Sequence, residues 1–302
     1  MALDTTHPAA ATGTRKLHPA PAPRRTPRPQ RTRLWVKIVI TLLLIVEIYP
    51  LIWMFLTSLK SNSDYLNHST WSLPSTWEWG NYADAWTTGN IGLYLQNSVL
   101  AVVPALALML LLGTAAGFAL QVMVWKGRSL TLLIFLAGMM VPPQMILLPL
   151  FTVYFQTGLS GTLWPLILTY TGTGLPLTVF MMATYYRSLP RELFEAATID
   201  GAGILRAFWT ISIPLVKNAL LTVGLVQFFF IWNDLLIALT FTNNQDLRTI
   251  QVGLLNFSGD FGATQYGPLF AAICINVFGT LVIYLFLNQK VMKGLTSGAV
   301  KG

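Results

Sequence analysis

Long apolar stretches separated by short polar segments make up the chain from residue 34 to its end. A helix needs about 20 mostly apolar residues to cross a bilayer. Residues 129–186 contain no charged side chain and are long enough for two such helices, with a turn at the polar, glycine-containing piece 156–162. The pattern therefore predicts an all-α membrane protein with six transmembrane helices. The predicted spans are 34–58, 99–125, 129–155, 163–186, 214–241 and 265–289.

The composition favours a membrane protein and excludes an ordinary soluble enzyme. Hydrophobic residues make up 54% of the 302 residues and charged residues 10%, whereas a soluble domain carries about 25% charged residues. The single cysteine, Cys274, has no partner for an internal disulfide. The three histidines, His7, His18 and His68, all lie outside the apolar stretches. We therefore expect no metal site and no cofactor bound by this chain.

Residues 1–33 differ from the rest of the chain, because they hold seven basic residues, one acid, six prolines and no long apolar run. This composition predicts a disordered basic cytosolic tail, followed by one six-span domain over 34–302. The positive charge of this tail would also suit binding to nucleic acid. Attraction to anionic lipids of the inner leaflet is the simpler interpretation, because a membrane span follows at once. We expect membrane lipid, and no nucleic acid, as a partner.

Lys and Arg are distributed unequally between the two sides of the predicted bundle. If both termini lie in the cytosol, only Lys60 and Arg248 of the 19 Lys and Arg residues lie outside. Cytoplasmic loops of membrane proteins carry an excess of Lys and Arg. The distribution therefore predicts a multi-pass protein whose N and C termini are cytosolic.

The largest cytosolic segment between spans, 187–213, has the pattern of a folded docking element. Pro190 suits the first turn of a helix, and the helix dipole favours the acidic residues that follow it. Ala196 and Ala197 are strong helix formers with little bulk, and Gly201 should end the helix. The pattern predicts two short helices with a smooth surface that another protein can approach closely. A loop folded only against its own chain is the alternative.

This segment contains Glu195-Ala196-Ala197, three residues, Gly201, nine residues and then Ile211-x-Ile213-Pro214. The pattern resembles the EAA motif of binding-protein-dependent ABC importer permeases. Ile213 is the one departure, where the family usually has Leu. The resemblance runs from residue 34 to the end and is greatest to the second permease subunit of maltose-type sugar importers. Further matching segments are Tyr49-Pro50-Leu51-Ile52-Trp53, Ser58-Leu59-Lys60, Asn81-Tyr82, Asn97-Ser98, Trp232-Asn233-Asp234 and the ending 293–302.

The resemblance implies the type I permease fold of ABC importers. Its coupling helix would be formed by Glu195, Ala196, Ala197 and Gly201, with Asp200 supporting the turn. A second, homologous permease subunit would complete the translocation path in the cytoplasmic (inner) membrane of a bacterium or archaeon. An extracytoplasmic binding protein would deliver a mono- or oligosaccharide.

Two cytosolic ATPase subunits would bind ATP and Mg and drive this transport. The chain itself has no Gly-x-x-x-x-Gly-Lys-Ser/Thr sequence, so it lacks the phosphate-binding P-loop of such ATPases. We therefore expect a non-catalytic subunit of an ATP-hydrolysing complex.

Candidates for the translocation path lie where prolines or polar residues interrupt apolar helices. Two adjacent prolines before Gln144 should kink or break the third span, and broken backbone in a membrane is tolerated beside protein or a water-filled cavity. Gln144 is therefore a candidate lining residue, although a kink packed against a neighbouring helix fits equally. Trp232, Asn233 and Asp234 offer a ring and polar groups to a sugar, or they shape a gate or contact the other permease.

Four further features carry weaker predictions. Glu47 would be costly facing lipid, so we expect it to face the subunit interior and to be hydrogen-bonded, with a direct transport role as the alternative. The segment Gly113–Gly117 fits close helix packing. Aromatic residues in the outer loop 59–96 fit the membrane–water boundary, and the outer loop 242–265 is placed to contact a docked binding protein.

Two other classes of protein compete with the importer interpretation. A stand-alone secondary transporter or channel for a small polar solute could also have six spans. Ion-coupled carriers, however, place ionisable residues in several mid-membrane helices, and here only Glu47 is clearly central. An intramembrane enzyme lacks support, because the spans contain no paired acids and no nucleophile–base pair.

Overall fold

The structure is a computed structural model that describes residues 30–258 and 264–299, with side chains described for 34–258 and 264–286. Residues 1–29 of the predicted tail lie outside the described part, and the chain is already helical from Gln30. The chain divides into two compact units, 1–50 and 51–302, which are treated separately below.

The described residues form helices joined by turns, which confirms the predicted all-α membrane fold. Five helices are long and apolar enough to cross a membrane, and a bent pair supplies a sixth crossing if it counts as one span. The long helices are α1 (Gln30–Thr57), α4 (Ile91–Gln121), α7 (Trp164–Arg187), the continuous helix made by α9 (Ile204–Ala207), a π turn (Phe208–Ser212) and α10 (Ile213–Trp232), and α13 (Tyr266–Ala299). The bent pair is α5 (Arg128–Gly138) and α6 (Pro143–Gln156).

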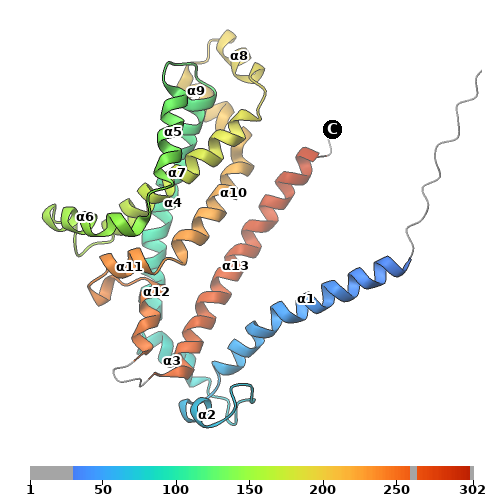
Figure 1. Ribbon diagram of the computed structural model, residues 1–302, viewed down its shortest axis with the longest axis vertical. Coiled ribbons are helices and arrows are strands. Elements are labelled where there is room, and N and C mark those ends of the chain that lie inside the picture. The colour runs from blue at the N-terminus through green and yellow to red at the C-terminus, as the bar shows by residue number, and fades with distance from the viewer. Residues whose placement is uncertain (1–29, 259–263, 300–302) are drawn as a thin grey trace, which may run out of the picture. The chain divides into compact units, whose positions relative to one another are not determined.

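Short helices lie at both ends of the second unit (Figure 1). One end carries α8 (Glu192–Ile199), which joins α7 to α9, and the other end carries α2 and α3, with α4 running between the two ends (Figure 1). We call these the α8 end and the α2 end. The remaining short helices are α2 (Asn62–Asn67), α3 (Gly80–Thr87), α11 (Leu236–Phe241), α12 (Ile250–Gly253) and the 3-10 turns Gln245–Leu247 and Leu254–Phe257.

In the first unit, α1 exposes apolar side chains on every face. All residues from Leu34 to Pro50 are exposed, Glu47 included. The expectation that Glu47 faces the subunit interior and is hydrogen-bonded stays a prediction. A helix that is apolar all round is covered by lipid or by other protein.

The structure places the bounds of the fifth predicted span, 214–241, differently from the sequence pattern. The helix made by α9, the π turn and α10 begins at Ile204, before Pro214, and ends at Trp232. Pro214 does not start this helix because the π turn before it is wide: the N–H of Ile213 donates to the carbonyl of Phe208, five residues back. A wide turn of this kind accommodates a residue that lacks an N–H and crowds the preceding turn.

The predicted break in the third span is present. Helices α5 and α6 meet at 93°, and Pro143 is the first residue of α6, where its missing N–H leaves no helical bond unmade. The position before it, Pro142, has extended backbone, which is the conformation that a following proline favours. The two prolines therefore account for the sharp turn.

Helices α4 and α7 pack closely because α4 presents glycines to α7. A Cβ atom added at Gly117 would lie 2.9 Å from the Cβ of Met182 and 3.0 Å from the backbone nitrogen of Ala183. At Gly113 it would lie 2.4 Å from a methyl group of Thr178. The glycine pair, four residues apart on one helix face, allows the backbones this close approach. The predicted small-residue packing is thus found within the chain.

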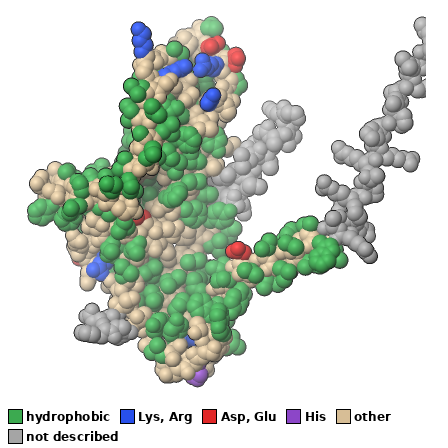
Figure 2. Space-filling model, in the orientation of Figure 1, with side chains coloured by type: hydrophobic (Ala, Val, Ile, Leu, Met, Phe, Trp, Pro, Cys, Tyr) green, Lys and Arg blue, Asp and Glu red, His purple; other side chains and the backbone are tan. Residues whose placement is uncertain are grey.

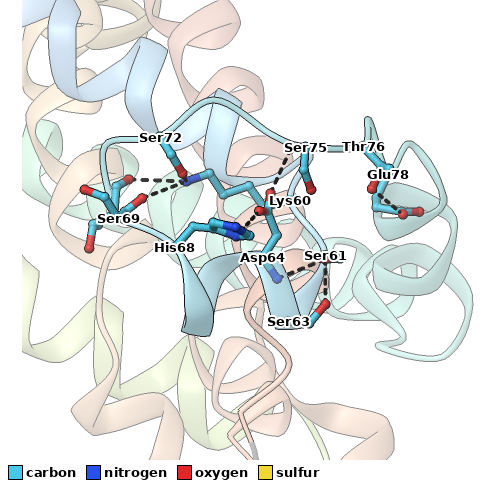
Figure 3. A network of polar contacts seen from close by, with 11 residues as sticks. Lys60, Ser61, Ser63, Asp64, His68, Ser69, Ser72, Ser75, Thr76 and Glu78 are labelled. Atoms are coloured by element: carbon cyan, nitrogen blue, oxygen red, sulfur yellow. Dashed lines mark hydrogen bonds and ion pairs between the residues drawn. The ribbon is translucent and has the colours of Figure 1, made fainter.

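At the α2 end, a buried polar network shapes the segment that follows α1. The Nζ atom of Lys60 donates to the hydroxyl of Ser72 at 3.1 Å and contacts two backbone carbonyls, and the Lys60 side chain is almost fully buried. The carboxylate of Asp64 accepts the backbone N–H of Ser75 at 3.0 Å and pairs with His68 at 2.8 Å (Figure 3). These bonds close the segment 60–78 into a compact loop.

Two of the residues that carried the resemblance attach this loop to α3. The Asn81 side chain donates to the carbonyls of Ser58 and Lys60, both at 2.9 Å. The hydroxyl groups of Tyr82 and Ser58 are 2.8 Å apart, and burial raises the pKa of Tyr82 to about 12. These residues therefore have a structural role at the α2 end.

We predict that Gly117→Ala destabilises the protein by about 1–3 kcal/mol, because an added methyl group overpacks a rigid interface. The matched control is Gly172→Ala on α7, where an added Cβ meets nothing within 4 Å. Thermal unfolding of the purified protein in detergent measures both variants. An equal shift in the two melting temperatures would contradict the close-packing explanation.

We predict that Asp64→Asn loosens the α2 end at neutral pH and that the difference from wild type disappears in acid. The Ser75 N–H, with the nearby charges of His68 and Lys60, holds the pKa of Asp64 below its usual 3.8. A depressed pKa means that the ionised carboxylate stabilises the fold above about pH 3.8, and this contribution is lost as the pH falls below that value.

The measurement is the melting temperature of wild type, Asp64→Asn and Glu78→Gln at pH 7, 5 and 3. Glu78 is an exposed carboxylate in the same loop and serves as the control. The gap between wild type and Asp64→Asn should persist at pH 5 and narrow at pH 3. A gap that widens in acid would contradict the assigned sign.

Candidate coupling loop and membrane cavity

The EAA segment forms a short helix, α8, at the turn between two membrane-spanning helices. The carbonyl of Arg191 accepts the backbone N–H of Phe194 at 2.9 Å and that of Glu195 at 3.1 Å, which starts the helix. Glu192 and Glu195 lie in the first turn, where carboxylates are favoured by the helix dipole. Both carboxylates are exposed, and neither makes an ion pair within the described residues.

Gly201 ends α8 because its backbone adopts a left-handed conformation, with φ of 77°. The N–H of Gly201 donates to the carbonyl of Thr198 at 3.0 Å, and the N–H of Ala202 donates to that of Ala197 at 2.9 Å. This pair of bonds is the Schellman motif, in which glycine is the usual left-handed residue. The motif turns the chain towards α9 within two residues.

The inner face of α8 packs onto an aromatic cluster at the ends of three long helices. Phe194 is buried, and its ring centroid lies 5.8 Å from that of Phe118 at the end of α4. Phe118 also contacts Phe208 in the π turn at 5.4 Å and Tyr186 at the end of α7 at 5.9 Å. Edge-to-face contacts at these distances are favourable. A displacement of α8 therefore acts on all three helices.

A hydrogen bond closes the base of the same loop. The hydroxyl of Tyr186, in the last turn of α7, bonds to the hydroxyl of Ser212 in the π turn, and both residues are buried. Segment 187–211 leaves and re-enters the helical bundle on either side of this bond. Turns of the π type recur at functional positions in helices.

The outer face of α8 and of the turn that follows it exposes apolar side chains. Ile199 is 85% exposed and Leu205 is 73% exposed. Exposed residues of this kind, surrounded by charge, mark protein contact sites, and Figure 2 shows basic and acidic side chains gathered at the α8 end. Glu195, Ala196 and Asp200 are exposed as well.

Ala197 differs from the sequence expectation, because it is buried on the inner face beside Phe194. Neither the burial of Phe194 nor the exposure of Ile199 was predicted from the sequence. The spacing of Phe194 and Ala197, three residues apart, was the available signal for an inner face. Behind α8, a cavity of about 460 Å³ lies between the loop and the ends of α4 and α7, with Gln121, Arg187 and Glu195 in its wall.

A second cavity, which we call the membrane cavity, lies where two helices are interrupted. It has a volume of about 280 Å³. One wall is the break between α5 and α6, a second is the middle of α7, and a third is the break between α10 and α11. Its lining residues are Met139, Pro143, Tyr170, Thr173, Gly174, Leu177, Gln227, Phe230, Ile231, Asp234 and Ile237.

Of the predicted path residues, only Asp234 lines the membrane cavity. Gln144 is exposed on α6 and is not in the wall. Trp232 is buried, and its Nε1 donates to the side-chain oxygen of Asn276 at 3.0 Å, so it packs α10 against α13. Asn233 is exposed and lines a separate cavity. The segment Trp232-Asn233-Asp234 thus lies at the end of α10, and its three side chains point to different places.

The polar residues that share the membrane cavity with Asp234 were missed in the sequence. The Tyr170 hydroxyl donates to the Oδ2 atom of Asp234 at 3.0 Å. The Gln227 amide donates to the carbonyl of Gly174 and to the hydroxyl of Thr178, both at 2.9 Å. A lone amide in an apolar span was the signal that could have identified Gln227.

The cavity and the coupling loop both lie in a segment that known transport proteins share. Residues 109–289, more than half of the chain, match the family described as binding-protein-dependent transport system inner membrane component. The chain belongs to this family. The EAA resemblance is thereby confirmed, and the alternative of a carrier or channel that acts alone is set aside.

Curated relatives and a solved structure agree with this assignment. The chain is 36% identical over 258 residues to the diacetylchitobiose uptake system permease protein NgcG of Streptomyces coelicolor, with 85% of each chain covered. It is 32% identical over 247 residues to the melibiose/raffinose/stachyose import permease protein MelC of Bacillus subtilis, which covers 82% of this chain and 88% of MelC.

The solved structure is of a bacterial ABC transporter involved in the import of the acidic polysaccharide alginate. One of its chains matches this fold with a TM-score of 0.74 at 21% identity, covering 87% of this chain and 99% of that chain. The match confirms the ABC importer permease fold.

We predict that Gly201→Ala loosens the end of α8, because a side chain costs about 1–2 kcal/mol in the left-handed conformation. Trypsin cleavage after Arg206, which is exposed, should become about 5–30 times faster. The control is Gly203→Ala, since Gly203 has φ of −64° and an added Cβ there meets nothing within 4 Å. Equal cleavage rates in the two variants would contradict the strain argument.

Proposed function

We propose that this chain is one of two permease subunits of an ATP-driven sugar importer. Three points support the proposal: the family is binding-protein-dependent, one relative is named for diacetylchitobiose uptake, and another is named for melibiose, raffinose and stachyose import. A second, homologous permease completes the translocation path. An extracytoplasmic binding protein supplies the mono- or oligosaccharide.

The observation that carries the coupling role is the two-sided structure of α8. Phe194 fixes the inner face to the aromatic cluster, while Ile199 and Leu193 leave apolar surface on the outside. Ala196 adds no bulk to that surface, so a groove on an ATPase subunit can approach closely. The exposed carboxylates of Glu195 and Asp200 are free to pair with cations of that subunit.

Force on α8 reaches the membrane cavity through continuous helices. The bond between Tyr186 and Ser212 joins α7 to the π turn at the base of the loop. From there α10 runs to Trp232, and the membrane cavity begins where α10 ends. Closure of the ATPase dimer would therefore move the walls of the cavity. ATP and Mg bind to the two ATPase subunits, and this chain does not hydrolyse ATP.

The orientation follows from the proposed coupling. The α8 end faces the cytosol, and both termini are cytosolic, in the cytoplasmic membrane of a bacterium or archaeon. The α2 end then faces outward together with the segment 242–258. That segment is held in place by Asn97, whose amide donates to the carbonyls of Asp246 and Arg248 at 2.7 and 3.1 Å. It offers a fixed surface to the binding protein.

The test is a cross-link from Ile199 to an ATPase subunit in the assembled importer. Cys274→Ala first removes the native thiol, and Ile199→Cys then supplies one exposed thiol. A short bifunctional reagent should join Ile199→Cys to the ATPase, and sugar uptake into proteoliposomes should require ATP. The control is Leu66→Cys in α2, which is 62% exposed at the opposite end.

Capture of the ATPase from Leu66→Cys and not from Ile199→Cys would reverse the proposed orientation. Uptake driven by an ion gradient without the ATPase would contradict the importer function itself.

A further inference from the structure

The carboxylate of Asp234 faces the membrane cavity without an opposite charge. The described residues that line the cavity include no Lys, Arg or His, and no ion pair to Asp234 is found among the described residues. An uncompensated charge at membrane depth is costly and marks a functional position. Within the described residues, hydrogen bonds alone stabilise the carboxylate.

The membrane cavity lies partway along α7, a helix long and apolar enough to cross a membrane. Tyr170, Thr173 and Leu177 come from the middle turns of α7, which spans Trp164–Arg187. The breaks on either side leave irregular backbone within the bundle, which membrane proteins tolerate where it lines a cavity. In transporters, interrupted helices near the midplane form ligand sites.

The two oxygens of Asp234 differ in their hydrogen bonds. Oδ2 accepts the Tyr170 hydroxyl at 3.0 Å and the backbone N–H of Ala238 at 3.0 Å. Oδ1 has only a long contact of 3.4 Å from the N–H of Ile237. A carboxylate accepts up to about four hydrogen bonds. Tyr170 and Ala238 therefore hold the group in one orientation and leave Oδ1 with accepting capacity.

We propose that the membrane cavity is a transit site for one ring of a neutral sugar, with the Oδ1 atom of Asp234 accepting its hydroxyl groups; this rests on the proposed function. Thr173 lies in the same wall, and Phe230 presents an apolar ring, 64% exposed, to the C–H face of a sugar. The volume of about 280 Å³ lies near the lower limit for small-molecule sites, which suits a single ring.

The same carboxylate selects against anions. A negative group in a cavity with low-dielectric walls repels carboxylated or phosphorylated sugars and concentrates cations by tenfold or more. This subunit therefore discriminates between neutral and acidic sugars independently of the binding protein. Tyr170 acts as a positioning residue, because it touches Asp234 and is itself 2% exposed.

The charge of the cavity can be measured without knowing the sugar. In the assembled importer with Cys274→Ala, Thr173→Cys places a thiol in the wall; the Thr173 hydroxyl bonds only to its own helix. Methanethiosulfonate reagents carrying a quaternary ammonium or a sulfonate are then compared. We expect the cationic reagent to react about tenfold faster relative to the anionic one, and Asp234→Asn to remove this preference.

The control position is Thr280→Cys, in the neighbouring cavity of about 330 Å³ whose wall contains no charged residue. There the ratio of the two rates should not respond to Asp234→Asn. A ratio that is the same at both positions, or a cation from the second permease that neutralises the site, would overturn the proposal. The proposal would also be overturned if the thiol of Thr173→Cys reacted with neither reagent in any nucleotide state of the importer.

Uptake provides the second readout. Asparagine keeps a side-chain oxygen that can accept the Ala238 N–H, so Asp234→Asn should assemble normally. For the sugar that the wild-type importer takes up from a set containing melibiose, diacetylchitobiose and digalacturonate, we expect the KM to rise about tenfold with Asp234→Asn. The KM should be unchanged with Thr240→Val, a control on α11 outside the cavity wall.

The uptake outcomes separate the two proposals. Selection of digalacturonate by wild type, or an unchanged KM in Asp234→Asn, would overturn the transit site alone. Absence of ATP-dependent uptake of any sugar by wild type would overturn the proposed function, while the reagent ratios would still report the charge of the cavity.

Discussion

The close approach of α4 and α7 is the contact on which the rest of the second unit depends. Because Gly113 and Gly117 have no side chains, Thr178 and Met182 lie against the backbone of α4. Little apolar driving force brings helices together inside a bilayer, so such close packing carries much of the association. The contact places Phe118, one residue beyond Gly117, beside Tyr186. The aromatic cluster that receives α8 is therefore built on this helix pair.

Where helices of the bundle end or are crowded together, polar side chains bond to neighbouring backbone groups. Where α10 stops, Asp234 accepts N–H groups of the next short helix, and Gln251 donates to the carbonyl of Trp232 at 3.2 Å. On α7, the amide of Gln227 reaches the carbonyl of Gly174. Unsatisfied polar groups are expensive in lipid, so these bonds explain how a cavity with irregular walls persists at this depth.

The sequence predicted where the backbone turns or breaks, but it did not predict the directions of the side chains at those places. Proline and glycine constrain the backbone where they stand, so the break at Pro143 and the end of α8 at Gly201 could be read directly. The helix ends within the segment Trp232–Asp234, and this determines the directions of its three side chains. The apolar content of a span does not predict where the helix ends or which way these side chains point. The predicted helix start at Pro214 was wrong, because a helix can continue past a proline through a wide turn.

Several residues that mark the family have structural roles that explain why they occur together. The Asn81 side chain donates to the carbonyls of Ser58 and Lys60, just after α1. The Ser98 hydroxyl accepts the N–H of Ile250 at 2.8 Å. These three bonds join separate segments of the chain at the α2 end. A short motif can identify such residues, but only the folded chain shows that they act as connectors between loops.

The helix made by α9, the π turn and α10 connects the two proposed functional regions. Near its start, the π turn is bonded to α7 through Tyr186 and Ser212, and the helix ends at Trp232, two residues before the carboxylate of the membrane cavity. Gln227 ties its far half to α7 as well. Since both ends are bonded to α7, α10 cannot tilt alone. A movement of α8 must displace α7 and α10 together, and the wall that can yield is the one formed by the bent pair α5 and α6, where the two prolines interrupt the helix.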